Sequence, residues 1–71
     1  MRWTPAAMDR LERAARLGKR VSLSRRGTEF VAIARAIRLR SRGEELVVLL
    51  PMTGEELTFA LEEIDDFSVV D

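Results

Sequence analysis

The hydrophobic positions near the start of the chain repeat with the spacing of an amphipathic helix. The apolar residues that share one stripe are Met8, Leu11 and Ala15, with Ala7 and Ala14 beside them. Thr4 can accept a hydrogen bond from a free backbone N–H, and Pro5 suits the first helical position. Gly18 supplies the matching stop. The pattern therefore predicts a helix over residues 5–17.

After this helix the period of the pattern changes to two, and turn residues recur at short intervals. The expected strands span residues 19–25, 28–40, 45–50, 56–61 and 67–70. The expected turns lie at Arg26-Gly27, Arg42-Gly43 and Thr53-Gly54, and the segment LEEIDD is expected to form a short helical turn. Short, bent strands in meander order are typical of SH3-like and Sm-like barrels. The sequence predicts a mainly β domain over residues 1–71, with an N-terminal helix and a five-stranded SH3-like or Sm-like barrel over 19–70.

Two of the expected strands are apolar on both faces. In the strand at 28–40, Phe30, Ala32 and Ala34 point one way, and Val31 and Ile33 point the other. The run LVVLL has the same property. Such strands need a second cover, which either the helix with Trp3 or a second copy of the chain can supply. The larger side chains expected in the core are Leu11, Val21, Leu23, Ile37, Val47, Leu49, Phe59, Leu61 and Ile64.

Composition limits the class of protein. A chain of 71 residues without cysteine forms no disulfide and no thiolate metal site. Its longest apolar run, LVVLLPM, is much shorter than the roughly 20 residues that cross a bilayer. The N-terminal segment carries charges where a signal peptide needs an apolar stretch. We therefore expect a single soluble, cytoplasmic domain.

The residue types also argue against catalysis and metal binding. The chain has no His, Cys or Tyr, so the usual pairs of nucleophile and general base are absent. Its acidic doublets are Glu44-Glu45, Glu55-Glu56, Glu62-Glu63 and Asp65-Asp66. Adjacent strand residues point to opposite faces, so these doublets do not converge on an ion. We expect no enzyme, no metal and no cofactor.

Charge is sorted along the chain. Residues 20–42 contain seven arginines and one acid, Glu29, whereas residues 43–71 contain nine carboxylates and no Lys or Arg. A closed barrel with this sequence is expected to be a charge dipole that steers association with a charged partner. Arg40 and Arg42 are expected to meet Glu44 or Glu45 across neighbouring strands.

Four short runs, MDRLERAA, RRG, RGEELVVL and LEEI, resemble the Rho-binding antiterminator (Rof) family over about residues 8–67. The residues that carry the resemblance are Asp9, Leu11, Glu12, Gly27, Glu44, Leu61, Glu62 and Ile64. The resemblance implies a short helix joined to a small Sm-like barrel. It also implies binding to the terminator ATPase Rho through acidic residues that occupy an RNA-binding surface. Family members carry aromatic and cysteine residues in and just before the helix, whereas this chain has Met8 and Ala15 and lacks the upstream Tyr/Pro-Ile-Cys pattern.

Three hypotheses about partners follow. In the first, a regulator of transcription termination or antitermination binds a basic protein surface through Asp9, Glu12, Glu44 and Glu62. In the second, an Sm-like module binds an RNA backbone through Arg35, Arg38, Arg40 and Arg42. In the third, the domain associates with itself, and we expect a weak homodimer.

Overall fold

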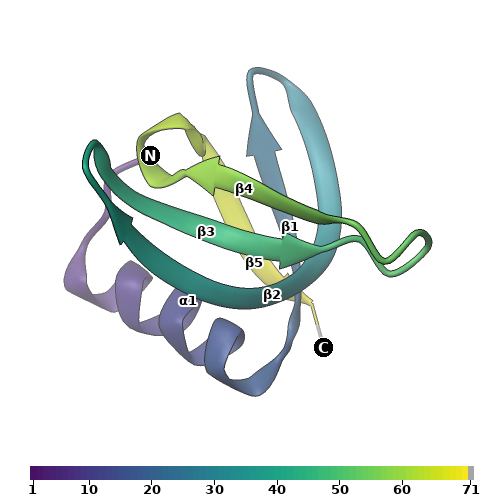
Figure 1. Cartoon of the computed structure of the whole chain (residues 1–71). Coiled ribbons are helices and arrows are strands. Elements are labelled where there is room, and N and C mark those ends of the chain that lie inside the picture. Colours follow the sequence, from purple (N-terminus) through teal and green to yellow (C-terminus); the bar gives the residue numbers. More distant parts are fainter. Residues whose placement is uncertain (71) are drawn as a thin grey trace.

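The computed structural model describes residues 1–70, in which one helix packs against one five-stranded antiparallel sheet (Figure 1). The elements are α1 (Pro5–Leu17), β1 (Arg20–Arg25), β2 (Thr28–Arg40), β3 (Gly43–Leu49), β4 (Glu56–Ala60), the 3₁₀ turn η1 (Leu61–Glu63) and β5 (Asp66–Val70). The helix, the five strands and the short helical turn are confirmed. Within residues 1–70, no helix has the length and apolar character needed to cross a membrane.

Both ends of α1 have the caps that the sequence predicts. The Thr4 hydroxyl accepts a hydrogen bond from the backbone N–H of Ala7 at 3.1 Å. Gly18 adopts a left-handed conformation with φ 65°, and its N–H donates to the carbonyls of Ala14 and Ala15. The predicted bounds of 5–17 are confirmed because both signals are local to the helix.

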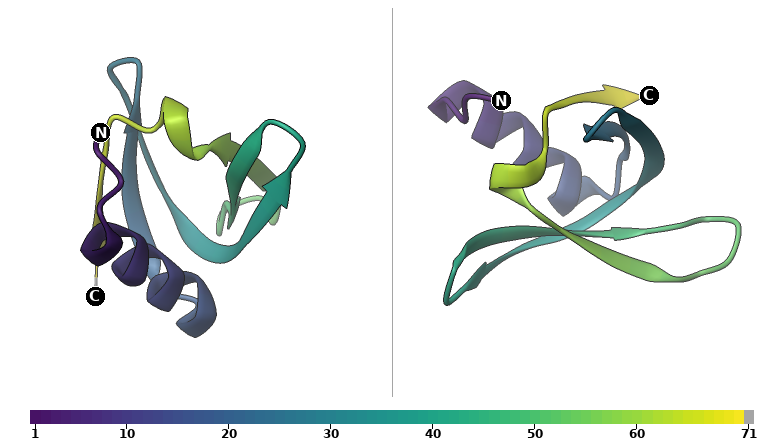
Figure 2. Two further views of the ribbon diagram at one scale, coloured as in Figure 1. Left: turned by 90° about the vertical axis from the view of Figure 1, so that its left-hand side faces the viewer. Right: turned by 90° about the horizontal axis from the view of Figure 1, so that it is seen from above.

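The turns between strands agree less closely with prediction. Arg26 and Gly27 form the β1–β2 turn, both with positive φ. The β2–β3 turn lies at Ser41-Arg42, one residue before the predicted position, because Gly43 already pairs with Arg40 in the ladder. The loop between β3 and β4 extends beyond the rest of the molecule (Figure 2).

The sheet curls but does not close into a barrel. Its order is β4-β3-β2-β1-β5, so β5 leaves the meander and pairs with β1, while β4 and β5 form the two edges. The 13-residue strand β2 pairs with β1 along its first half and with β3 along its second half, with a β-bulge between Ala34 and Ala36. The prediction of a closed barrel is wrong, because within residues 1–70 no ladder joins the edge strands β4 and β5.

The core lies between α1 and the inner face of the curled sheet (Figure 2). Seven of the nine predicted core residues are buried, whereas Ile37 and Leu49 are only partly buried. Leu49 follows buried Val48, so its side chain points to the outer face of the sheet. The buried residues outside that list of nine are Ala7, Ala14, Ala15, Ala32, Ala34, Leu46, Val48 and Phe67. Most are alanines, whose small side chains let backbone elements approach closely.

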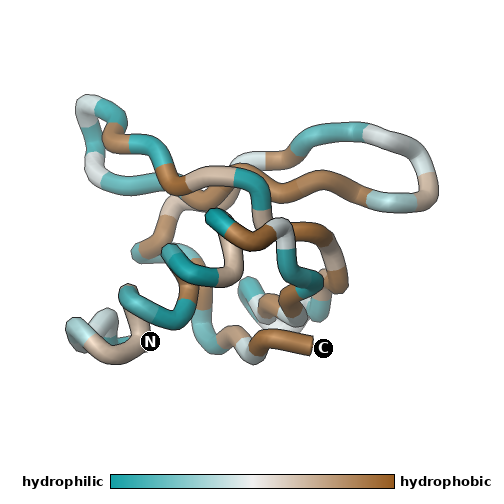
Figure 3. The backbone as a smooth tube through the Cα atoms, turned by 90° about the horizontal axis from the view of Figure 1, so that it is seen from below, coloured by the Kyte–Doolittle hydropathy of each residue, from teal (hydrophilic) through white to brown (hydrophobic). Residues whose placement is uncertain are grey.

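The helix covers one face of the two-sided strands. Ala32 and Ala34 are fully buried in the core that α1 completes, but Val31 on the other face is 49% exposed. The helix therefore does not supply the cover for Val31, because Met8 and Leu11 pack on the opposite face of β2. Hydrophilic and hydrophobic positions alternate along α1, whereas a continuous hydrophobic stretch lies within β3 (Figure 3).

Candidate functional site

The solvent face of α1 presents two of the predicted acidic residues. Asp9 and Glu12 are exposed and stand three residues apart, so their side chains are neighbours on the helix surface. Neither makes an ion pair with another of the described residues. Fully buried Leu11 and nearly buried Ala7 and Ala14 hold the opposite face of the helix against the core. The two carboxylates therefore lie on the exposed face of a helix whose opposite face is packed in the core.

The other two predicted acids lie elsewhere. Glu44 is in the first residues of β3 and Glu62 is in η1, and both side chains are exposed. Since β3 and η1 are in contact, these two residues share one end of the sheet. The structure thus divides the predicted acidic set into a pair on α1 and a pair beside the β2–β3 turn.

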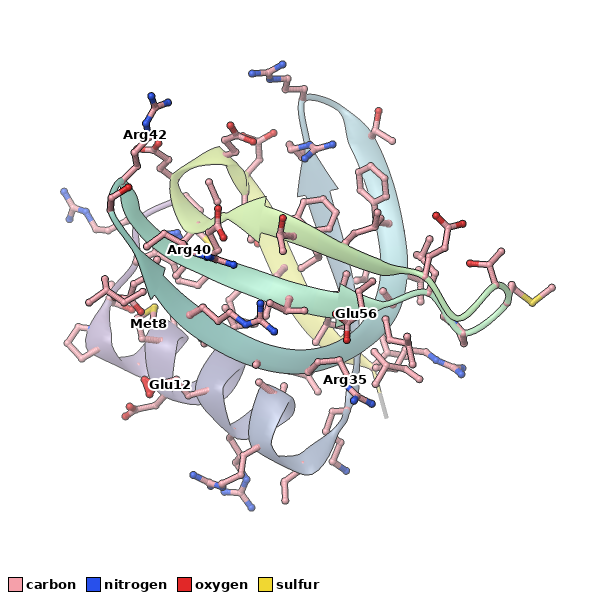
Figure 4. The ribbon with its side chains drawn as sticks, viewed as in Figure 1. Met8, Glu12, Arg35, Arg40, Arg42 and Glu56 are labelled. Carbon is pink, nitrogen blue, oxygen red and sulfur yellow. The ribbon has the colours of Figure 1, made fainter. Side chains whose placement is uncertain are left out.

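The predicted arginines of β2 are also separated. Arg35 lies below β2 toward the C-terminal end of α1, whereas Arg42 lies at the far end of the sheet, in the β2–β3 turn (Figure 4). Arg38 and Arg40 occupy alternate positions and share one face. Arg40 donates a hydrogen bond to Glu45 at 3.2 Å, which confirms the predicted pairing for Arg40. Arg42 makes no such pair with another residue of the described part of the chain. The four residues do not form one continuous track.

The bulge brings Arg35 to the helix. A groove of about 260 Å³ separates α1 from β2, and its lining consists of Glu12, Ala15, Arg16, Arg35, Ala36 and Ile37. A second opening of about 370 Å³ adjoins it and also has Arg16 and Arg35 in its lining. The sequence prediction missed Arg16. Its position outside the apolar stripe of the helix was the available signal.

The other side of α1 carries a further basic groove. About 340 Å³ lies between α1 and the end of β5, lined by Arg10, Arg13, Ala14, Leu17, Lys19 and Val69. Arg10 also places its guanidinium 5.5 Å from the centroid of the Phe67 ring. Basic side chains thus flank the C-terminal half of α1 on both sides.

Other charged residues hold the fold together. The Arg25 guanidinium lies 4.7 Å from the centroid of Phe59 and 5.4 Å from that of Phe30. The same side chain pairs with Glu63 at 3.9 Å, so it links β1 to β4 and η1. The Asp65 carboxylate accepts a hydrogen bond from the backbone N–H of Arg26 at 2.8 Å. These contacts assign Arg25 and Asp65 to the scaffold.

The aromatic rings contact one another or the core. The Trp3 ring stacks on Phe67 with centroids 5.4 Å apart, and its Nε1 donates to the Leu61 carbonyl at 2.8 Å. Phe30 meets Phe59 edge-on at 5.1 Å. Phe59 and Phe67 are buried, while Trp3 and Phe30 are partly exposed. These four rings therefore build the hydrophobic interior and do not form an open platform for stacking bases.

Over residues 1–70, no three His, Cys, Asp or Glu side chains cluster closely enough to hold a metal ion. A polar groove on β1 and β5 is lined by Ser22, Ser24, Ser68, Glu29 and Asp66 among others. There the Ser22 hydroxyl donates to the Glu29 carboxylate at 3.3 Å, and this contact is exposed to solvent.

No protein-family model, curated protein or solved structure matches this chain. The arguments about function therefore rest on its own residues and their arrangement.

Proposed function

We propose that this protein is a small, non-enzymatic binding module that docks on a basic protein surface through the acidic residues of α1. In this proposal it regulates transcription termination or antitermination. The observation that carries the proposal is the exposure of Asp9 and Glu12, without ion pairs among residues 1–70, on a helix whose other face is buried. The curled sheet, with β5 beside β1, serves as an incompletely closed SH3-like or Sm-like barrel that supports the helix.

An anchored helix is a suitable element for such docking. Side chains three residues apart on a helix lie about 5–6 Å apart at their Cβ atoms. Asp9 and Glu12 can therefore engage neighbouring Lys or Arg side chains of one partner together. Because the helix is already ordered, binding does not incur the entropy cost of folding a segment.

The resemblance to the Rof family supports a specific partner. It implies the terminator ATPase Rho, and Asp9 and Glu12 occupy the helix positions that carry the resemblance. Carboxylates that occupy an RNA-binding surface compete with phosphates for the same arginines and lysines. Glu44 and Glu62, at the β3 and η1 end of the sheet, add a second acidic contact in this proposal.

The test is binding of the purified full chain to purified Rho, measured by calorimetry at several salt concentrations. The variant Asp9→Lys/Glu12→Lys should lose at least tenfold in affinity while its circular dichroism spectrum is unchanged. Glu55→Lys/Glu56→Lys is the matched control, because these acids are exposed and lie on the β3–β4 loop and β4, away from α1. Equal losses in both variants, or no binding by the native chain, would overturn the proposal.

A further inference from the structure

We infer that the C-terminal half of α1 and the bulge of β2 form a second site, which binds the phosphodiester backbone of single-stranded RNA. Its residues are Arg13 and Arg16 of the helix and Arg35 of the strand. This site binds through arginines and not through Asp9 and Glu12, so it does not depend on the proposed docking of those acids, although Glu12 lies at its border.

The bulge creates the site. In a regular strand Arg35 would continue the alternation of β2 and point to the same side as Ile33 and Ile37. The register shift between Ala34 and Ala36 leaves Arg35 without a partner in β3. β-Bulges commonly turn a side chain toward a functional site. Here Arg35 shares the lining of two adjoining openings with Arg16, so strand and helix each contribute a guanidinium.

The three arginines are available to a ligand. None of them makes an ion pair or side-chain hydrogen bond with another of the described residues. In contrast, Arg25 and Arg40 are paired with Glu63 and Glu45. An arginine that lacks an internal partner keeps its five donors for a phosphate, which it can bind in a bidentate manner.

The shape between the arginines suits a single strand. Small residues, Ala15, Ala34, Ala36 and Gly18, line the openings beside Arg16 and Arg35, so a narrow chain can approach the backbone there. Arg13 follows on the other flank of the helix, about one turn from Arg16. The resulting band crosses α1 and can contact successive phosphates. A single strand is flexible enough to follow this band, whereas a duplex holds its phosphates on a stiff, regular helix.

The same arrangement limits what the site recognises. Glu12 lines one end of the groove, so its carboxylate repels phosphates and bounds the site. The aromatic rings are engaged with one another or the core, so bases have no open stacking platform. Binding should therefore depend on the backbone and show little preference for sequence.

The test uses the full chain and a fluorescein-labelled 12-nucleotide oligouridylate, with anisotropy recorded across a salt series. If three arginines each contact one phosphate, a plot of the logarithm of the association constant against the logarithm of the salt concentration should have a slope of about −2. Arg16→Glu/Arg35→Glu should weaken binding at least tenfold and reduce the slope to about −0.7, the value for one contact. Arg2→Glu/Arg26→Glu is the matched control, because both residues are exposed and lie outside the site, Arg2 before α1 and Arg26 in the β1–β2 turn.

The outcomes distinguish this site from its alternatives. A loss as large in the Arg2 and Arg26 control would show a general effect of net charge and overturn the site. Tighter binding to a polyglutamate peptide would show that an acidic protein is the occupant, and equal binding to a duplex would overturn the single-strand specificity. Asp9→Lys/Glu12→Lys should retain RNA binding even if it loses Rho, so the two proposals fail separately.

Discussion

The Nε of Arg40 on β2 donates a hydrogen bond to Oε1 of Glu45 on β3 at 3.2 Å. This pair joins the basic and acidic halves of the sequence, and Arg25 does the same with Glu63 at 3.9 Å. Antiparallel pairing and the curl of the sheet thus mix charges that are sorted along the chain. Part of the predicted dipole is therefore neutralised within the fold. Among residues 1–70, the arginines of α1 and the bulge have no such carboxylate partner.

The pair between Arg40 and Glu45 should contribute little to stability. Its side chains are 54% and 31% exposed, and ion pairs this accessible are worth about 0–1 kcal/mol. A double-mutant cycle with Arg40→Ala and Glu45→Ala, followed by urea unfolding, should give a coupling in that range. The coupling should shrink at high salt. A larger coupling that salt leaves unchanged would contradict this account.

Leu11 should be among the most sensitive positions of the helix. Its side chain is fully buried between α1 and the sheet, so Leu11→Ala leaves a cavity and should cost about 2–5 kcal/mol of unfolding free energy. Leu39→Ala is the matched control, because Leu39 is 81% exposed and should change stability by less than about 0.5 kcal/mol. Similar midpoints of urea unfolding for both variants would show that α1 is not packed as described.

Trp3 should stabilise the position of the N-terminal segment through two contacts that can be removed separately, the stacking on Phe67 and the hydrogen bond to Leu61. Trp3→Phe retains an aromatic ring against Phe67 but removes the indole hydrogen bond to the Leu61 carbonyl, which should cost about 0.5–1.5 kcal/mol. Trp3→Ala removes both contacts and should cost more. Chemical unfolding followed by circular dichroism measures both changes. If the two variants were equally stable, the ring contact would contribute nothing.

The outer face of β2 should support weak self-association. Val31 is 49% exposed there, and Ile33 and Leu49 pair beside it in the ladder with only partial burial. Burial of these side chains between two copies would remove apolar surface from water. Sedimentation velocity should show a sedimentation coefficient that rises with concentration, and Val31→Ser should weaken this rise. A native chain that stays monomeric throughout the concentration series would contradict the prediction.

Much of the local structure could be predicted because its signals are local. Thr4, Pro5 and Gly18 define the ends of α1, and alternation with glycine turns defines the strands. The bounds differ from prediction mainly where a glycine, Gly43, enters the ladder instead of the turn. The candidate acidic pair on α1 was predictable for the same reason, since residues three apart on a helix are always neighbours.

The sequence by itself determined the helix, the number of strands and the lack of His, Cys and Tyr, because these features depend on residue identity and short spacings. Tertiary structure alone decided that β5 pairs with β1, that the sheet stays open and that Arg35 meets Arg16 across a groove. Those features depend on strand partners distant in sequence and on a single shift of register at the bulge. Local periodicity is compatible with several pairings, and the chain selects among them only when the whole core is packed.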